Sequence, residues 1–181
     1  MPSCAAARPG VCPCCGAAAQ PLGGPLVVVG HGVVERQVRG PRTPDGPPVQ
    51  VLLQLRRYRC RACRAVLMVG PRGLLRGRWY SGGAIGLALA LYAQGATSAR
   101  VRERTSPSRV VGSSAREHWV TLTRWVEAAR CGDLFGVRAP AVGFARRAVA
   151  EQVALTLAAR AGRALGADLR ASAFAGALIA A

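Results

Sequence analysis

The chain has 181 residues, enough for one ordinary domain or two small ones, and only 5% of them are aromatic. All 25 basic residues are arginine and only eight residues are acidic, so the net charge is +17. This charge predicts a polyanionic partner, nucleic acid ahead of an anionic membrane surface. The longest apolar stretch, residues 84–93, is too short to cross a bilayer, and no signal peptide is visible. We therefore expect a cytoplasmic protein with no membrane partner.

The N-terminal part of the chain favours a small β unit. Residues 26–38 are strand-like, and residues 40–48 form a loop rich in proline and glycine. Residues 49–58 alternate apolar and polar side chains, which is typical of a half-buried strand. We expect these two strands to pair as an antiparallel hairpin and residues 66–69 to add a short third strand.

After residue 78 the apolar side chains recur with a helical period. The pattern predicts a first helix over 83–94 and a second over 98–104, capped by Thr97. Ser106-Pro107 predicts the start of a third helix, since serine is a good N-cap and proline suits the first helical position.

A longer helix is expected next, opened by the capping box of Ser114 and Glu117 and ending near residue 130. It should bury Trp119, Leu122, Val126 and Ala129. Residues 146–165 could form an amphipathic helix, and the apolar tail, 171–181, is either a helix that packs back or a remnant of a longer protein.

These elements predict an α+β fold in three parts. A zinc-ribbon hairpin unit occupies residues 1–75, a helix-turn-helix bundle occupies 76–136, and an alanine-rich helix and tail occupy 137–181.

Two C-x-x-C pairs are the strongest chemical signal, Cys12 with Cys15 and Cys60 with Cys63. Each tight turn offers two thiolates, and a hairpin that joins two such turns completes the tetrahedral ligand set of Zn²⁺. The 44 residues between the pairs exceed the usual spacing, and the hairpin with its loop accounts for the excess. In the cytoplasm thiols stay reduced, which favours metal binding over a disulfide.

Other interpretations of the cysteines remain open. The pairs could form a redox centre, and His31 is an alternative ligand. Cys14 is only two residues from Cys12, which is the wrong spacing for a C-x-x-C turn. We therefore expect Cys14 to be exposed and to have no role as a metal ligand. Arg64 occupies the position after the second pair where glycine is preferred, as Gly16 is after the first.

Two groups of residues are predicted to contact double-stranded DNA. Arginine forks bind phosphate oxygens and can read guanine edges. The cluster around the second cysteine pair should contact phosphates, and the second group should flank a recognition helix that begins at Ser106. A solvated basic face and a plain three-helix bundle are the alternatives. The two groups are Arg56, Arg57, Arg59, Arg61 and Arg64, and Arg100, Arg102, Arg104, Ser106, Ser108 and Arg109.

No catalytic constellation stands out, so we expect a protein that is not an enzyme. Strand transfer needs two or three carboxylates that hold paired Mg²⁺ ions. None of the eight acidic residues ends a predicted buried strand, and no glycine-rich phosphate loop or Ser/His/Asp set is present.

The pattern Cys-Pro-x-Cys-Gly, with His31, Arg36 and Arg39 on the following strand and Arg-Arg-Tyr-Arg-Cys-x-x-Cys at 56–63, resembles the zinc-ribbon N-terminal region of bacterial insertion-sequence transposases. Residues 79–81, the Ser-Pro-Ser turn and the helix at 121–125 resemble a bacterial family of unknown function. That family pairs such a ribbon with a helix-turn-helix and is linked to mobile elements. The resemblance covers about residues 12–135 and implies that the four paired cysteines are the zinc ligands. The transposase catalytic domain has no counterpart here.

These observations favour a zinc-dependent DNA-binding protein that is accessory to, or regulates, a separately encoded transposase. A transcriptional regulator unrelated to transposition is the nearest alternative. A zinc-ribbon adaptor could instead use the arginine face to bind an acidic protein. An RNA binder is a further alternative, but we expect the exposed aromatic platform that stacks single-stranded RNA to be absent.

Overall fold

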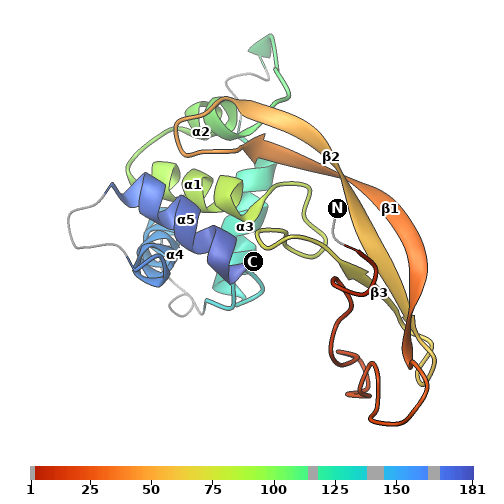
Figure 1. Cartoon of the computed structure of the whole chain (residues 1–181). Helices are drawn as coiled ribbons and strands as arrows, with labels where there is room; N and C mark the ends of the chain where they lie inside the picture. The colour runs from red at the N-terminus through yellow and green to blue at the C-terminus, as the bar shows by residue number, and fades with distance from the viewer. Residues whose placement is uncertain (1–2, 114–117, 138–144, 163–167) are drawn as a thin grey trace. The chain divides into compact units, whose positions relative to one another are not determined.

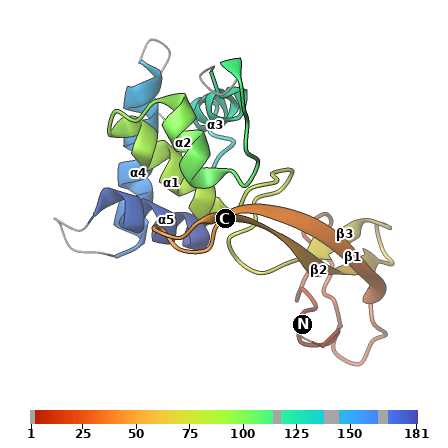
Figure 2. The same cartoon turned by 90° about the horizontal axis from the view of Figure 1, so that it is seen from above.

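The computed structural model describes residues 3–113, 118–137, 145–162 and 168–181. In these segments the chain forms a three-stranded antiparallel sheet and five helices, which confirms the predicted α+β class (Figures 1 and 2). It divides into two compact units. The first contains Met1–Gln37 and Leu52–Pro71, and the second contains Val38–Val51 and Arg72–Ala181. None of the helices in the described segments is long and apolar enough to cross a bilayer.

The sheet consists of β1 (Val28–Pro41), β2 (Pro48–Cys60) and β3 (Val66–Val69), in the order β1-β2-β3. The hairpin and the third strand are confirmed. The two hairpin strands end three and two residues later than the patterns predict, and β1 begins two residues later and β2 one residue earlier. Tyr58 pairs with Leu67 across β2 and β3, and both side chains are buried. The first unit has a small core around this pair, made of Cys12, Ala19, Val28, Tyr58, Cys60 and Leu67.

The core of the second unit is built around α1 (Gly82–Ala93). The helix predicted over 83–94 is confirmed, and its helical period does not reveal that α1 is buried on all sides from Gly82 to Ala90. The reason is that α4 (Arg146–Arg160) and α5 (Leu169–Ala180) both pack against it, side by side with it in Figure 1. The apolar tail is therefore a helix that packs back.

Glycine allows the helices of this core to approach closely. A Cβ atom at Gly86 would lie 2.6 Å from the carbonyl oxygen of Ala173 on α5. At Gly176 on α5, a Cβ atom would lie only 1.7 Å from the carbonyl oxygen of Leu157 on α4. No side chain fits at either position without moving a helix backbone.

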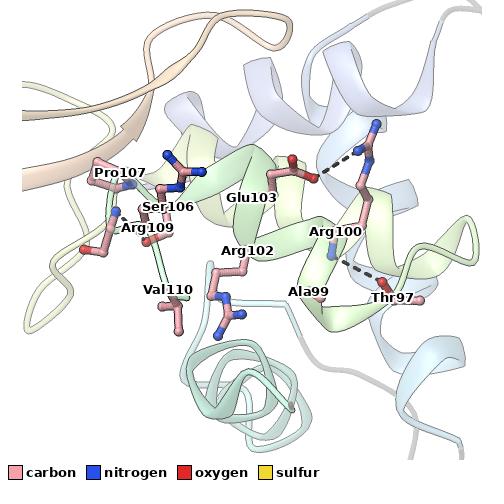
Figure 3. A pocket seen from close by; sticks show the side chains of 10 residues that line it. Thr97, Ala99, Arg100, Arg102, Glu103, Ser106, Pro107, Arg109 and Val110 are labelled. Atoms are coloured by element: carbon pink, nitrogen blue, oxygen red, sulfur yellow. Dashed lines mark hydrogen bonds and ion pairs between the residues drawn. The ribbon is translucent and has the colours of Figure 1, made fainter. Parts of the chain in front are cut away.

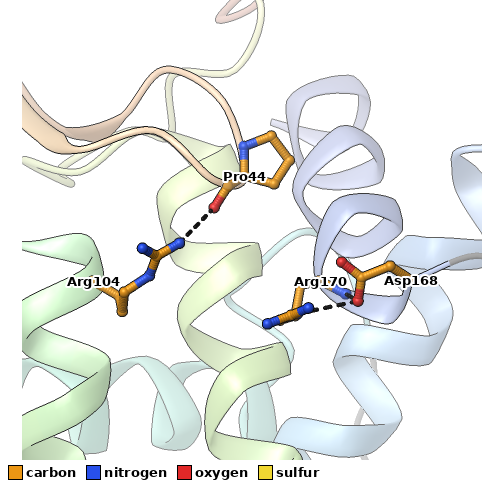
Figure 4. A network of polar contacts seen from close by, with 4 residues as sticks. All are labelled: Pro44, Arg104, Asp168 and Arg170. Atoms are coloured by element: carbon orange, nitrogen blue, oxygen red, sulfur yellow. Dashed lines mark hydrogen bonds and ion pairs between the residues drawn. The ribbon is translucent and has the colours of Figure 1, made fainter.

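Helix α2 (Ser98–Thr105) follows α1 after a four-residue turn in which Gly95 has a φ of 98°. The predicted cap is confirmed, since the Thr97 hydroxyl accepts a hydrogen bond from the Arg100 N–H at 3.2 Å. The Arg104 guanidinium donates to the Pro44 carbonyl oxygen at 3.4 Å and so ties α2 to the hairpin tip, residues 38–51 (Figure 4).

Asp168 forms the N-cap of α5. Its carboxylate accepts from the Arg170 N–H and pairs with the Arg170 guanidinium at 3.1 Å (Figure 4). Partial burial acts to raise the pKa of Asp168, but these bonds to Arg170 outweigh it and hold the pKa below its usual value.

The prediction of a helix that starts at Ser106-Pro107 is wrong. Ser106 is the C-cap of α2 with an extended backbone, and the described residues that follow, up to 113, form no α-helix. The Ser106 hydroxyl accepts from the Tyr80 hydroxyl at 2.9 Å and from the Ser108 N–H at 3.3 Å, so it does not cap a helix. Serine often bonds its own backbone in this way, and Gly112, at a φ of 78°, also interrupts helical geometry.

Helix α3 (Val120–Arg130) is the long helix of the prediction, beginning later. The capping box of Ser114 and Glu117 lies outside the described residues. The four side chains predicted to be buried are buried, and so is Trp125. Trp119, Trp125 and Tyr80 meet edge to face, with ring centroids 5.0–5.9 Å apart, which fixes α3 against the segment before α1.

Helices α4 and α5 share one hydrophobic core with α1 and α3. The sequence patterns place residues 76–136 and 137–181 in separate parts, whereas the structure joins them. Alanine and glycine give weak hydrophobic periodicity, so the patterns did not reveal that these helices complete the core.

Replacing Gly176 with alanine should destabilise the second unit by about 1–3 kcal/mol or more, because the new methyl group collides with the Leu157 carbonyl. Thermal or urea unfolding followed by circular dichroism measures the effect. Ile179→Ala on the same helix is the control, since Ile179 is exposed and its removal should change stability by about 0.5 kcal/mol or less. Equal stability of Gly176→Ala and the unaltered protein would contradict this packing.

Candidate metal centre and arginine surfaces

Four cysteines from two distant parts of the sequence meet in the first unit. The sulfur atoms of Cys12, Cys15, Cys60 and Cys63 all lie within 4.8 Å of one another. The Cys12 and Cys63 sulfurs are 3.7 Å apart, and the Cys15 and Cys60 sulfurs are 3.8 Å apart. In a tetrahedron with metal–sulfur bonds of about 2.3 Å the sulfurs are about 3.8 Å apart. The four side chains therefore have the separation that one tetrahedral metal ion requires.

The two turns that present these cysteines have the same backbone hydrogen bond. The Cys12 N–H donates to the Ala17 carbonyl oxygen at 2.8 Å, and the Cys60 N–H donates to the Ala65 carbonyl oxygen at 2.9 Å. In each turn the first cysteine is buried and the second exposed. The chain thus builds one ligand-presenting turn twice, first in the loop before β1 and then between β2 and β3.

Both turns require a left-handed residue immediately after the second cysteine. Gly16 takes this position in the first turn with a φ of 72°, and Arg64 takes it in the second with a φ of 63°. The sequence expectation that glycine is preferred there has its physical reason in this conformation. A left-handed backbone costs a residue with a Cβ atom about 1–2 kcal/mol, and Arg64 bears that cost.

The thiol groups influence one another's acidity. The Cys14 N–H, which bonds the Cys12 sulfur, is the largest cause that lowers the pKa of Cys12 to about 6. At Cys63 the Ala65 N–H acts in the same direction. Although the residue as a whole is exposed, loss of water around its sulfur and hydrogen bonds to the other three sulfurs outweigh that effect and raise the pKa to about 12. One thiolate thus forms readily, and further thiolates in so small a space need a cation to balance their charge.

The remaining cysteines and His31 do not belong to this cluster within the described residues. Cys14 is exposed, as predicted, and Cys131 is exposed at the end of α3. The Cys4 carbonyl oxygen accepts a hydrogen bond from the buried Tyr58 hydroxyl at 2.6 Å, which holds the N-terminal loop against the core. His31 lies exposed on β1.

Arginine side chains border the second cysteine turn. Arg59, Arg61 and Arg64 line a shallow pocket of about 370 Å³ together with Val29. Arg57 is two residues from Arg59 in β2, so both side chains lie on the sheet face opposite to buried Tyr58. The guanidinium groups of these four arginines form no hydrogen bond or ion pair with any described residue. Arg56, the fifth member of the predicted cluster, lies on the Tyr58 face and does form a contact within the structure.

Five residues of the second predicted group line one pocket of about 630 Å³ between α2 and the segment that follows it (Figure 3). They are Arg100, Arg102, Ser106, Ser108 and Arg109. Within it Arg100 pairs with Glu103 at 3.0 Å and Ser106 is buried, whereas Arg104, the sixth member, is bound to the hairpin tip. Arg109 lies in an irregular segment and not on a recognition helix, so the structure does not present it to base edges as predicted.

Sequence reasoning missed a third arginine surface, around Trp79. Trp79 is 58% exposed, and the Arg39 guanidinium lies 5.0 Å from the centre of its ring. The residues are 40 positions apart and come together because β1 bridges the segment before α1 at Arg39 and Tyr80. Only this long-range bridge could have revealed the pair.

Comparison of the chain with protein-family models, with curated proteins and with solved structures finds no match. Its chemistry must therefore be inferred from its own residues.

Purified protein should contain one metal ion per chain, because the four sulfurs form one ligand set. Removal of the ion by a chelator should unfold the first unit, whose core is small, since metal binding and folding are coupled in such sites. Elemental analysis together with circular dichroism before and after chelation is the measurement.

Cys60→Ser should abolish stoichiometric metal binding, whereas Cys14→Ser is the matched control and should retain it. A metal content near zero in protein prepared under reducing conditions without chelator would exclude the site.

Proposed function

We propose that this chain is a zinc-dependent DNA-binding protein without catalytic activity of its own, accessory to or regulating a separately encoded transposase. Zinc is the ion of the proposal because a closed set of four cysteine thiolates is typical of structural zinc sites. The association with a transposase rests on the resemblance of the cysteine and arginine pattern to transposase zinc ribbons.

The backbone conformation and the side chain of Arg64 are the main support for DNA binding. Its left-handed backbone suits glycine, yet the position holds a long cationic side chain with no partner among the described residues. Strain of this kind persists where the side chain has a function. Arg64 also lines the same pocket as Arg59 and Arg61, so three guanidinium groups converge where an anion can bind.

The charge of the zinc-bearing unit exceeds what the metal centre needs. Met1–Gln37 and Leu52–Pro71 contain seven arginines and one glutamate, a formal net charge of +6. Four thiolates and one Zn²⁺ add −2, which leaves about +4. The surplus lies on a rigid turn, and rigid arginines bind phosphate oxygens with little loss of side-chain entropy. Phosphates of duplex DNA are an anionic ligand that this charge can bind.

A zinc-ribbon adaptor for an acidic protein is the second candidate. Met68 and Val66 on β3 are paired with Arg57 and Arg59 and are exposed at 64% and 47%. Methionine and arginine together are enriched in protein interfaces. If DNA binding does not depend on Arg57 and Arg59, their charge needs another partner, and the adaptor becomes the better explanation. A transcriptional regulator shares the proposed chemistry, and a transposase gene beside this one would distinguish the two roles.

Replacing Arg57 and Arg59 with alanine should weaken duplex binding equally on all sequences, because arginines that bind phosphates carry no sequence information. The slope of log affinity against log salt should fall by about one unit for each phosphate that the variant no longer neutralises. Fluorescence anisotropy titrations at several salt concentrations measure both quantities. The Arg170→Gln variant, altered in the second unit, is the control for a change of charge elsewhere. An unchanged affinity and salt slope in the double variant would contradict the proposal.

Arg64→Gly should have opposite effects on stability and on binding. Relief of the left-handed strain should stabilise the metal-loaded unit by about 0.5–1 kcal/mol, after allowance for the greater chain entropy of glycine. Removal of the guanidinium should weaken duplex binding. Thermal unfolding and anisotropy of the same samples measure the two effects. Ala62→Gly in the same turn adds flexibility without relieving strain, so it should only destabilise. If Arg64→Gly bound DNA as tightly as the unaltered protein, Arg64 would have no binding role.

A further inference from the structure

We propose that the pocket beside Trp79 in the second unit binds a single unpaired nucleotide, with the base stacked on Trp79 and the phosphate held by arginine. This site goes beyond the duplex binding proposed for the zinc-bearing unit and does not depend on it. It is lined by Arg39, Gly77, Arg78, Trp79, Tyr80, Thr121, Arg124 and Trp125, and its volume is about 420 Å³.

The pocket has an anchored cation beside an exposed ring. The Arg39 backbone N–H donates to the Trp79 carbonyl oxygen at 2.8 Å, and the Ser81 N–H donates to the Arg39 carbonyl oxygen at 3.0 Å. The Arg39 side chain is fixed as well, because its Nε donates to Gln50 Oε1 at 3.0 Å. Its two terminal nitrogens have no hydrogen-bond partner among the described residues and remain available to an anion.

The aromatic ring is fixed in place but not covered. Tyr80, the next residue, is buried against Trp119 and Trp125, so the backbone that carries Trp79 cannot move freely. Trp79 itself remains 58% exposed although the Arg39 guanidinium lies over its ring. An exposed tryptophan with a planar guanidinium on it is the arrangement on which nucleic-acid bases stack, because every base has a flat π face.

The charges of the pocket select an anionic ligand. Its lining includes three arginines and no carboxylate. Arg124 is exposed on α3 and its side chain forms no hydrogen bond or ion pair with any described residue, and Thr121 adds a hydroxyl one helical turn away. A flat apolar surface, two available cations and a hydroxyl together match a base joined to a phosphate. An acidic peptide would satisfy the arginines but leave the tryptophan without a stacking partner.

The site requires a base that is not stacked in a duplex, since the face of a paired base is not accessible. DNA and RNA both offer such nucleotides, in single strands, at strand ends or after base flipping. The shared chemistry is a nucleobase with a phosphate, and the experiment must distinguish the two sources.

The test uses the full-length, metal-loaded protein and labelled single strands about ten nucleotides long, one of DNA and one of RNA in the same sequence. A duplex of the same sequence and an oligoglutamate peptide are the further probes. Anisotropy gives the affinity, and quenching of tryptophan fluorescence reports stacking. Trp79 should dominate the quenching because it is 58% exposed, whereas Trp125, which also lines the pocket, is only 2% exposed and Trp119 is buried.

Trp79→Ala should weaken single-strand binding about ten-fold or more and remove most of the quenching, while Trp79→Phe should keep most of the affinity. Arg124→Gln should weaken binding without abolishing stacking. Ile179→Ala and Arg170→Gln alter an exposed apolar residue and an exposed arginine elsewhere in the unit and should have no effect. An equal fall in affinity for DNA and RNA assigns the shared nucleotide chemistry, and a fall for one strand only assigns that nucleic acid.

The proposal is overturned if Trp79→Ala and Arg124→Gln bind both strands as the unaltered protein does, or if only the peptide binding responds to them. Trp79→Phe and Arg124→Gln leave the core intact, so a folding failure of Trp79→Ala does not prevent the test. The Arg57→Ala, Arg59→Ala double variant separates this site from the duplex site. It should bind duplex more weakly and retain single-strand quenching, so each proposal can fail without the other.

Discussion

The close approach of four sulfur atoms is the constraint on which the first unit depends. Among its described residues, the main buried cluster contains six side chains, two of which are cysteines of the metal-ligand set. So little apolar surface cannot offset the chain entropy that folding removes. A metal ion held by the four sulfurs would join the loop before β1 to the turn after β2, which are far apart in the sequence, and would supply the stability that the core lacks.

The same constraint explains how charge is arranged on this unit. A turn fixed by a metal does not need favourable side-chain contacts, so its exposed positions can carry like charges. The unpartnered guanidinium groups at 57, 59, 61 and 64 repel one another, and Arg64 also bears backbone strain. Both effects oppose folding. A metal ion bound by the four sulfurs would contribute far more free energy than these two effects remove. Under the proposed function, a bound polyanion would relieve the repulsion.

The second unit is stabilised differently, by close packing of small residues. Alanine and glycine let α1, α4 and α5 approach until backbone atoms of one helix meet those of another. The hairpin tip belongs to this unit, and it contributes Arg39 to the pocket at Trp79. The hairpin is longer than a metal-binding turn requires, and its extra length has a structural role. It provides both the turn that carries the second cysteine pair and the cation beside an exposed ring.

The sequence by itself determined the features that depend on local spacing. Two C-x-x-C turns predict that the four cysteines meet, strand alternation predicts the hairpin, and Thr97 marks the start of α2. The sequence also identified the position of Arg64 as one that favours glycine, since a left-handed residue is a local requirement. Only the tertiary structure decided the rest. Ser106 had every local mark of a helix cap, but the Tyr80 hydroxyl and the Ser108 N–H engage its side chain in a different conformation. Periodicity alone could not show that α1 is enclosed on all sides, because alanine and glycine acquire their packing role only from the helices that meet them. Nor could it show the pairing of Arg39 with Trp79, which exists because a strand from one part of the chain bridges a segment 40 residues away.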